Sequence, residues 1–251
     1  MTKQLEGKIA IVTGAAGGFG EGIARLFVAE GARVLLVDID LAKAQQLATE
    51  LGECASAQRC DVSNGDEVRA AVQACVDVFG TPDIVVNNAG TTHRNQPMLD
   101  VDEATFDRVF NVNVKSIYYM THAVLPLMRK RGSGNIINIG STAGIRPRPG
   151  LTWYNASKGA VNLMSKSMAA ELGPDNIRVN VGCPVMGATA LIEQFLGVPD
   201  TPESRAKVIA GIPLGRMSTP QDVANATLYL ASDASAFITG VELPVDGGRT
   251  I

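Results

Sequence analysis

The stretch Ile9-Ala-Ile-Val-Thr-Gly14-Ala-Ala-Gly-Gly18-Phe-Gly20 decides the fold of this chain. Its short apolar run is typical of a strand buried on both faces, and a helical pattern follows from about Phe19 to Glu30. Glycines at the start of a helix let the backbone approach a pyrophosphate, which the free N–H groups and the helix dipole attract. The segment therefore predicts a strand, a phosphate-binding turn and a helix, although a glycine-rich turn can also be purely structural.

The same alternation continues along the chain. Further short runs rich in Val and Ile occur at Arg33–Val37, Ile84–Val86, Ile136–Ile139 and Arg178–Val181, and helical patterns at Leu41–Leu51, Asp66–Phe79, Glu103–Arg131 and Tyr154–Leu172. This order predicts an α/β fold with a doubly wound, mostly parallel sheet and helices on both faces, Rossmann-like. With no linker or repeat, residues 1–251 are expected to form a single domain. The irregular part, about residues 185–213, is expected to be a substrate loop region with short helices.

Composition excludes several classes of function. The net charge of −3 gives no electrostatic case for nucleic acid. Four cysteines without CxxC spacing are expected to be reduced thiols, and two histidines are too few for a histidine-rich metal site, so no metal is expected. The start of the sequence does not look like a signal peptide, and no apolar stretch is long enough for a membrane span. We therefore expect a cytoplasmic protein without a membrane or nucleic-acid partner.

Asp38 ends the second strand run, 18 residues after Gly20. A carboxylate at this position can accept hydrogen bonds from the adenosine ribose hydroxyls and would repel a 2′-phosphate. Asp38 therefore favours NAD(H) over NADP(H) as the cofactor. The alternative is that Asp38 caps the helix expected at Leu41–Leu51.

Three segments together resemble the short-chain dehydrogenase/reductase family: Thr13–Gly20, Asn87–Gly90 and Tyr154-Asn-Ala-Ser-Lys158. The resemblance runs from end to end and includes Asp61-Val62, Asn113, Ser141, Asn180, Pro184 with Thr189, and Val245–Gly248. It implies an oxidoreductase that transfers a hydride between NAD(H) and a secondary alcohol or ketone. It also implies a homotetramer formed through the long fourth and fifth helices and the C-terminal strand.

The resemblance also implies site residues. Asp61 and Val62 would hold the adenine, Thr189 would contact the nicotinamide carboxamide, and Asn113 would position a proton-relaying water. The implied cofactor-binding residues are Gly14, Gly18, Phe19, Gly20, Asp38, Asp61, Val62, Asn88, Ala89, Gly90, Tyr154, Lys158 and Thr189, and the implied catalytic residues are Asn113, Ser141, Tyr154 and Lys158. One departure is Val185, where the family usually has glycine after proline.

The residue types suit the chemistry. A tyrosine has a pKa near 10, and lowering it by about three units requires roughly 4 kcal/mol of preferential stabilisation of the phenolate. Lys158 lies four residues after Tyr154, hence on the same helix face, and its ammonium could supply a term of that order. Tyr154 would then act as a base in oxidation and as an acid in reduction. The Ser141 hydroxyl, just after a strand, would bind the substrate oxygen.

Substrate identity is expected to depend on the loops Thr91–Met98, Thr142–Trp153 and Val185–Pro213. Candidate substrate residues in them are His93, Arg94, Arg146, Arg148 and Trp153. Their cationic groups would suit an anionic alcohol, such as a hydroxy acid or a sulfonated or phosphorylated polyol. The alternative is that both loop arginines, Arg146 and Arg148, point to solvent or pair with acids of a neighbouring subunit.

Two other functions compete with this interpretation. A 3-oxoacyl-thioester reductase could present Arg129-Lys130-Arg131 to an acidic carrier protein, but Asp38 argues against the NADPH that such relatives prefer. Asp175 also stands where carrier-binding relatives tend to have a base. A non-catalytic NAD(H)-binding protein would tolerate loss of the tyrosine or the lysine, whereas all four catalytic positions are filled here.

Overall fold

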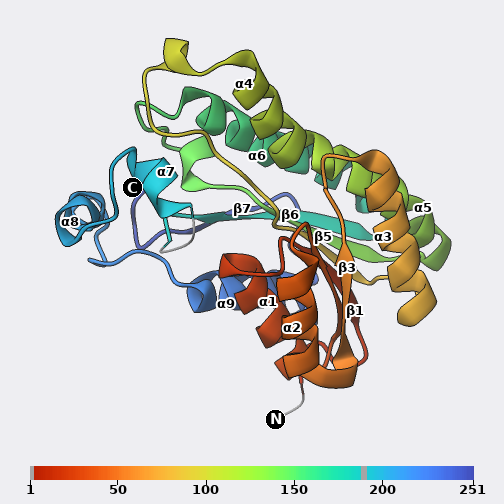
Figure 1. Ribbon diagram of the computed structural model, residues 1–251. Coiled ribbons are helices and arrows are strands. Elements are labelled where there is room, and N and C mark those ends of the chain that lie inside the picture. Colours follow the sequence, from red (N-terminus) through yellow and green to blue (C-terminus); the bar gives the residue numbers. More distant parts are fainter. Residues whose placement is uncertain (1–2, 188–190) are drawn as a thin grey trace.

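The computed structural model describes residues 3–187 and 191–251, and its centre is one parallel sheet of seven strands (Figure 1). The strand order is β3-β2-β1-β4-β5-β6-β7. The strands are β1 (Ile9–Thr13), β2 (Arg33–Asp38), β3 (Ala55–Arg59), β4 (Ile84–Asn87), β5 (Gly134–Ile139), β6 (Ile177–Pro184) and β7 (Glu242–Val245). Each of the five predicted runs lies within one of these strands. The predicted doubly wound parallel sheet is therefore confirmed.

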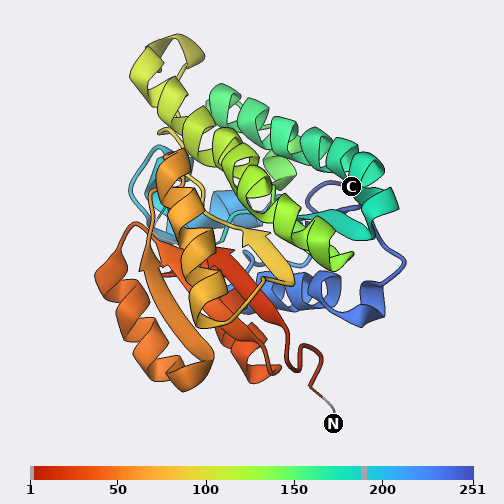
Figure 2. The same cartoon turned by 90° about the vertical axis from the view of Figure 1, so that its right-hand side faces the viewer.

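Helices cover both faces of the sheet (Figures 1 and 2). One layer consists of α1 (Gly18–Ala29), α2 (Leu41–Leu51) and α9 (Pro220–Ala231), and the other of α3 (Gly65–Val78), α4 (Glu103–Phe110), α5 (Ser116–Arg131) and α6 (Thr152–Leu172). Two short helices, α7 (Ile192–Leu196) and α8 (Pro202–Ile209), follow β6. They lie to one side of the layers, next to the end of the chain (Figure 1).

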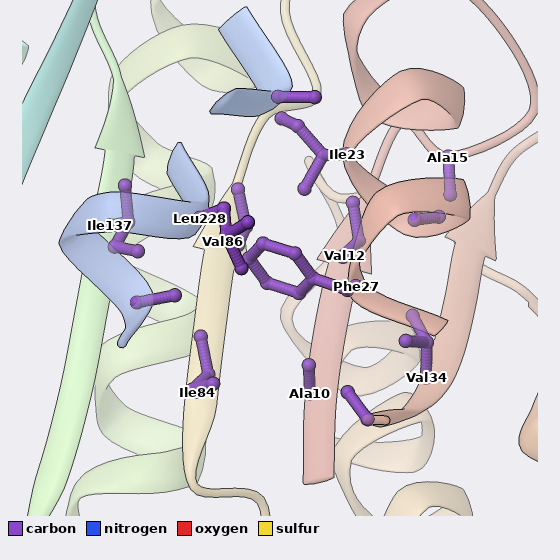
Figure 3. Packing of buried hydrophobic residues seen from close by; sticks show 14 of the residues in the cluster. Ala10, Val12, Ala15, Ile23, Phe27, Val34, Ile84, Val86, Ile137 and Leu228 are labelled. Carbon is purple, nitrogen blue, oxygen red and sulfur yellow. The ribbon is translucent and has the colours of Figure 1, made fainter. Parts of the chain in front are cut away.

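Apolar side chains between the sheet and each helix layer form the core. Phe27 of α1 is fully buried and packs toward Val12 of β1, Val86 of β4 and Leu228 of α9 (Figure 3). On the other face, Val124 and Met128 of α5 belong to a second buried cluster with strands β1, β2 and β4 to β6. Each such side chain contributes about 1.5–3 kcal/mol by leaving water. Packing on both faces fixes the strand ends on which the site is built.

Three parts of the fold were not marked by the apolar and helical patterns of the sequence. Strands β3 and β7 lie at the two edges of the sheet and are only partly buried, so they lack a continuous apolar run. Helix α9 was missed as well. The helix predicted at Glu103–Arg131 is interrupted by a π-helical turn, Asn111–Lys115, which separates α4 from α5. Such turns insert one residue into a helix and are frequent at functional sites.

All four cysteines are free, and burial raises the pKa of the Cys60, Cys75 and Cys183 thiols to about 12. Within residues 3–187 and 191–251, no cluster of His, Cys, Asp and Glu could hold a metal ion. No helix in the same ranges is long and apolar enough to span a bilayer.

Candidate active site

A cavity of about 760 Å³ opens at the carboxyl edge of the sheet. Parallel α/β sheets bind ligands at this edge, because the loops that follow the strands meet there. The segments after β1, β4, β5 and β6 all contribute to its wall, together with α6, α7, α8 and the end of the chain. Wall residues predicted to bind cofactor or to react are Gly14, Gly18, Phe19, Asn88, Ala89, Gly90, Ser141, Tyr154 and Lys158.

The glycine turn, Thr13–Gly20, leads from β1 into α1. Gly14 and Gly18 have φ values of +63° and +58°, which side chains rarely allow. Gly17 is the N-cap of α1, and no side chain caps this end of the helix. A Cβ built on Gly17 would have no described atom within 4 Å. The first N–H groups of α1 therefore have no side-chain partner from the cap position. This arrangement fits a bound pyrophosphate.

Gly20, which was also predicted to bind the cofactor, does not line the cavity. A Cβ on Gly20 would lie 2.0 Å from the Gly14 carbonyl oxygen. Gly20 is therefore needed for close packing of α1 against the turn, and its contact with the cofactor stays a prediction.

Hydrogen bonds join the glycine turn to the segment after β4. The Asn88 side-chain amide donates to the carbonyl oxygens of Thr13, at 2.9 Å, and Gly14, at 3.1 Å. In return the Thr13 hydroxyl oxygen accepts from the backbone N–H groups of Asn88 and Ala89, both at 3.0 Å. The two segments thus form one rigid floor, with Gly90 at its end.

Asp38 supports the glycine turn from the end of β2. Its carboxylate accepts hydrogen bonds from the backbone N–H groups of Ala16 and Asp40, both at 2.9 Å. The N-cap of α2 is Asp40, whose side chain accepts from the Lys43 N–H group, so Asp38 is not the helix cap.

Asp38, Asp61 and Val62 all lie outside the cavity wall, although they end or follow β2 and β3 on the same sheet edge. The Asp61 carboxylate accepts from the backbone and the hydroxyl of Ser63, and Val62 is buried in the apolar cluster beneath α3. Thr189 lies outside the described residues.

The four predicted catalytic residues lie close together around the floor. Tyr154 and Lys158 are buried on α6, one turn apart, and Ser141 follows β5. The Lys158 Nζ donates to the Ile139 carbonyl oxygen at 2.8 Å. A Cβ built on Gly90 would lie 3.4 Å from Asn113 Oδ1 and 3.5 Å from Lys158 Nζ, so both side chains reach the end of the floor.

Asn113 lies in the π-helical turn, and its side-chain amide both donates and accepts hydrogen bonds within the protein. Its Oδ1 accepts from the Thr91 N–H group at 2.8 Å, and its Nδ2 donates to the Thr91 carbonyl at 2.9 Å and to the Ser157 hydroxyl at 3.0 Å. Asn113 therefore ties the loop after β4 to α6, and its expected role in positioning a water stays a prediction.

Burial governs the ionisation of the site. Burial raises the pKa of Tyr154 to about 12. A hydrogen bond with Ser141 and the charge of Arg148 both lower this pKa, but by less than burial raises it. Burial also lowers the pKa of Lys158 to about 8. The cation that lowers the Tyr154 pKa is thus Arg148, whereas Lys158 was expected to act in this way.

The structure does not bring three predicted substrate residues to the cavity: His93, Arg94 and Trp153. The buried His93 ring accepts from the Tyr154 backbone N–H at 3.4 Å, and Arg94 donates to the Gly197 carbonyl at 2.9 Å. The Trp153 indole N–H donates to the Met98 carbonyl at 3.2 Å. Backbone hydrogen-bonding groups hold all three side chains, which therefore brace the loops around the site.

Arg146 and Arg148 do line the cavity. The Arg146 guanidinium donates to the main-chain oxygens of Arg249, at 2.8 Å, and Ile251, at 3.1 Å. Arg148 is half-buried and donates to the Phe195 carbonyl at 3.2 Å. Both side chains thus reach residues far away in sequence, which the sequence could not show.

Several wall residues were not named as candidates, although the first three lie in loops expected to determine substrate identity: Asn95, Phe195, Lys207 and Arg249. The Phe195 ring of α7 packs edge-on against the Tyr154 ring, with centroids 5.0 Å apart. Position next to Val245–Gly248 was the one available signal for Arg249.

Val185 occupies the position where glycine was expected. Its backbone N–H donates to the Val245 carbonyl at 3.2 Å, and its carbonyl accepts from the Ser218 hydroxyl at 2.9 Å. The pairing of β6 with β7 is therefore extended by one residue, and the Val185 side chain becomes part of the cavity wall.

Comparisons with known proteins agree with this geometry. A family model described as enoyl-(acyl carrier protein) reductase matches residues 14–250. The chain is 47% identical over 250 residues to 4-formylbenzenesulfonate dehydrogenase TsaC1/TsaC2 of Comamonas testosteroni, which covers 98% of this chain and 99% of the relative. It is 38% identical over 251 residues to 3-oxoacyl-[acyl-carrier-protein] reductase FabG of Thermotoga maritima, covering 99% and 100% of the two chains.

The crystal structure of 3-ketoacyl-(acyl-carrier-protein) reductase from Brucella melitensis complexed with NADH superposes with a TM-score of 0.93. The sequence identity is 44%, and the match covers 98% of this chain and 100% of the other. This chain belongs to the short-chain dehydrogenase/reductase family. It is an oxidoreductase.

Proposed function

We propose that the protein transfers a hydride between NAD(H) and an alcohol or carbonyl substrate, with Ser141, Tyr154 and Lys158 as its catalytic residues. One observation carries the proposal: a single cavity contains these three side chains and an uncapped glycine turn suited to a pyrophosphate. The similar structure that was solved with NADH supports it.

Bound NAD(H) would supply or accept the hydride. In reduction, the Tyr154 hydroxyl gives its proton to the substrate oxygen as the carbonyl carbon gains the hydride, and in oxidation the phenolate takes that proton back. The Ser141 hydroxyl donates a hydrogen bond to the same oxygen. The raised pKa of Tyr154, about 12, keeps the phenol protonated in the free enzyme. Reduction therefore starts from the correct protonation state, and oxidation should become faster as the pH rises.

Asp38 supports NAD(H) over NADP(H), since its carboxylate is fixed beside the glycine turn by the Ala16 N–H group. A 2′-phosphate at this place would meet a like charge. We expect fluorescence titrations to give a lower Kd for NADH than for NADPH. Asp38→Ala should reduce the ratio of these two Kd values by about tenfold, because a charged hydrogen bond is worth on the order of 1.5 kcal/mol. Tighter binding of NADPH by the unaltered protein would contradict this role of Asp38.

The relatives also include reductases of carrier-bound thioesters, so that function is the second candidate. The predicted carrier patch is largely engaged within the chain itself. Arg129 pairs with Asp175 at 2.7 Å, and Arg131 contacts Asp83 at 3.2 Å. These pairs favour a free small molecule over a carrier protein.

We further propose a homotetramer built through α5, α6 and β7. Apolar side chains exposed on or near these elements support it: Tyr118 on α5, Leu163 on α6, and Phe237 just before β7. Light scattering after size-exclusion chromatography would measure the mass in solution, and a monomer would refute this assembly.

The function is tested by assaying the protein with NADH and a panel of aldehydes and ketones, and with NAD+ and the matching alcohols. Turnover that is lost in Ser141→Ala would support the proposed catalytic site. Tight NADH binding without turnover of any compound would favour the non-catalytic alternative.

A further inference from the structure

One wall of the cavity carries a group of cations besides Lys158 of the hydride-transfer site. Arg146 and Arg148 come from the loop after β5, Lys207 from α8, and Arg249 from the end of the chain. Among the described residues, the whole cavity wall includes no aspartate or glutamate. The wall is therefore strongly positive although the chain as a whole carries a net charge of −3.

The two half-buried cations of this wall, Arg148 and Arg249, line the same cavity. Burial lowers the pKa of Arg148, and the charge of Arg249 lowers it further. Among residues 3–187 and 191–251, neither guanidinium forms an ion pair with a carboxylate, whereas nine other cationic side chains do so. Two like charges removed from water without a counter-charge are costly, unless a bound anion supplies that charge.

Hydrogen bonds hold this pair in place. Asp246 accepts from the backbone N–H groups of Gly248 and Thr250, which fixes the segment that carries Arg249. Arg146 binds the Arg249 carbonyl at 2.8 Å, and Asn155 binds the Arg148 carbonyl, also at 2.8 Å. The backbones of both arginines are thus anchored from several elements. Such preorganisation is characteristic of a binding site.

The position of the pair relates it to the reacting atoms. Arg148 donates to the Phe195 carbonyl at 3.2 Å, and the Phe195 ring packs against the Tyr154 ring with centroids 5.0 Å apart. Apolar side chains also line the cavity: Leu151, Leu191, Phe195, Leu196, Val198 and Val208. The space beside Tyr154 therefore offers an apolar surface together with an arginine pair.

We infer that the substrate has an apolar body and an anionic substituent, a carboxylate or a sulfonate, that binds between Arg148 and Arg249. Arginine suits such groups because its N–H donors match two oxygens at once. Lys207, which is exposed, adds attraction at the surface, and Arg146 positions Arg249 through its backbone. This inference rests on the proposed function, since the bound molecule must also present its reacting carbon to Tyr154.

The test compares anionic aldehydes with neutral amides of the same shape in the NADH-dependent reaction. The pairs are 4-formylbenzoate with 4-formylbenzamide, and 4-formylbenzenesulfonate with 4-formylbenzenesulfonamide. We expect kcat/KM for the anion to exceed that for the amide by at least about tenfold. Whichever of the two pairs has the larger ratio identifies the preferred oxyanion.

Variants then locate the preference. Arg249→Gln and Arg148→Gln should each reduce the anion-to-amide ratio by about tenfold, and Arg249→Lys should keep most of it because the charge remains. Arg108→Gln is the matched control, because it removes one exposed positive charge on α4, outside the cavity. It should leave the ratio unchanged.

Calorimetry of the four compounds with the NADH-saturated protein separates the two proposals. Ratios near one, ratios that neither arginine variant changes, or variants that weaken NADH binding instead would overturn the anion site while leaving hydride transfer intact. Tight binding of the anions that depends on Arg249, but without turnover, would keep the anion site and contradict the proposed function. Equal binding of anion and amide without turnover would contradict both.

Discussion

The glycine-turn side and the substrate side of the cavity are held together by different kinds of contact. The turn and the segment after β4 follow adjacent strands, and the Asn88 and Thr13 side chains lock them together with backbone partners. The substrate side joins loops that lie up to about one hundred residues apart, through single side chains such as Asn95, Arg94 and Arg146. The first side is therefore part of the fold, while the second can change without disturbing the sheet.

The largest effect is expected where the two sides meet. Tyr154→Phe removes the proton-transferring hydroxyl but keeps the ring against Phe195. We expect kcat to fall by about 10²–10⁴-fold, as for the loss of a general acid–base group, while NADH binds nearly as before. Steady-state kinetics and a fluorescence titration measure the two quantities. A variant that keeps a tenth of the normal kcat would rule out this assignment.

A pair of glycine substitutions examines the turn side alone. Gly20→Ala places a Cβ against the Gly14 carbonyl and should cost about 3 kcal/mol or more of the free energy of unfolding, since backbone must move. Gly17→Ala, three residues earlier, meets open space in extended backbone and should change stability by no more than about 1 kcal/mol. Urea denaturation measures both. Equal losses in the two variants would show that the turn is not packed as described.

Lys158→Met sharpens the comparison by separating stability from activity. Burial lowers the Lys158 pKa from 10.5 to about 8. Below pH 8 the buried ammonium is therefore charged in the folded protein, and its desolvation destabilises the fold. Between pH 8 and 10.5 only the unfolded chain retains this proton, so the stability of the unaltered protein rises with pH. Without cofactor, the variant should be more stable at pH 7, by up to about 3 kcal/mol, and inactive.

The stability gain of Lys158→Met should shrink between pH 8 and 10.5 and disappear well above pH 10.5, where lysine is neutral in both states. Thermal or urea unfolding of both proteins across this range checks it. A gain that is independent of pH would mean that the ammonium is not the cause.

The smallest effect is expected on the substrate side. Asn95→Ala removes donors to the carbonyl oxygens of Pro149, at 3.3 Å, and Phe195, at 3.4 Å. These bonds are long, so stability should fall by only about 1 kcal/mol. Because α7 would be held less firmly over Tyr154, KM for the substrate should rise several-fold while NADH binding stays unchanged. An equal loss of NADH affinity would show that the two sides are not independent.

What the sequence could predict follows the same division. Buried strands such as β1 and β4 are continuous apolar runs, and the glycine turn has a local pattern, so both were found. The edge strands β3 and β7 gave no such signal, because half-buried positions tolerate polar residues and even Pro244. Asn95, Phe195 and Arg249 were missed because only tertiary contacts bring them to the cavity. For the same reason His93 and Trp153 were expected in the wall although backbone groups hold them elsewhere.

The π-helical turn at Asn111–Lys115 has a consequence for how this chain tolerates deletions. One extra residue in an α-helix changes its rotational phase by about 100°, so α5 presents a different face to the sheet than it would as a direct continuation of α4. Deleting a single residue here would give a more regular helix. It would also turn either Asn113 away from Thr91 or the Val124 and Met128 face away from the core. The segment is therefore a place where restoring ideal helix geometry would damage the protein.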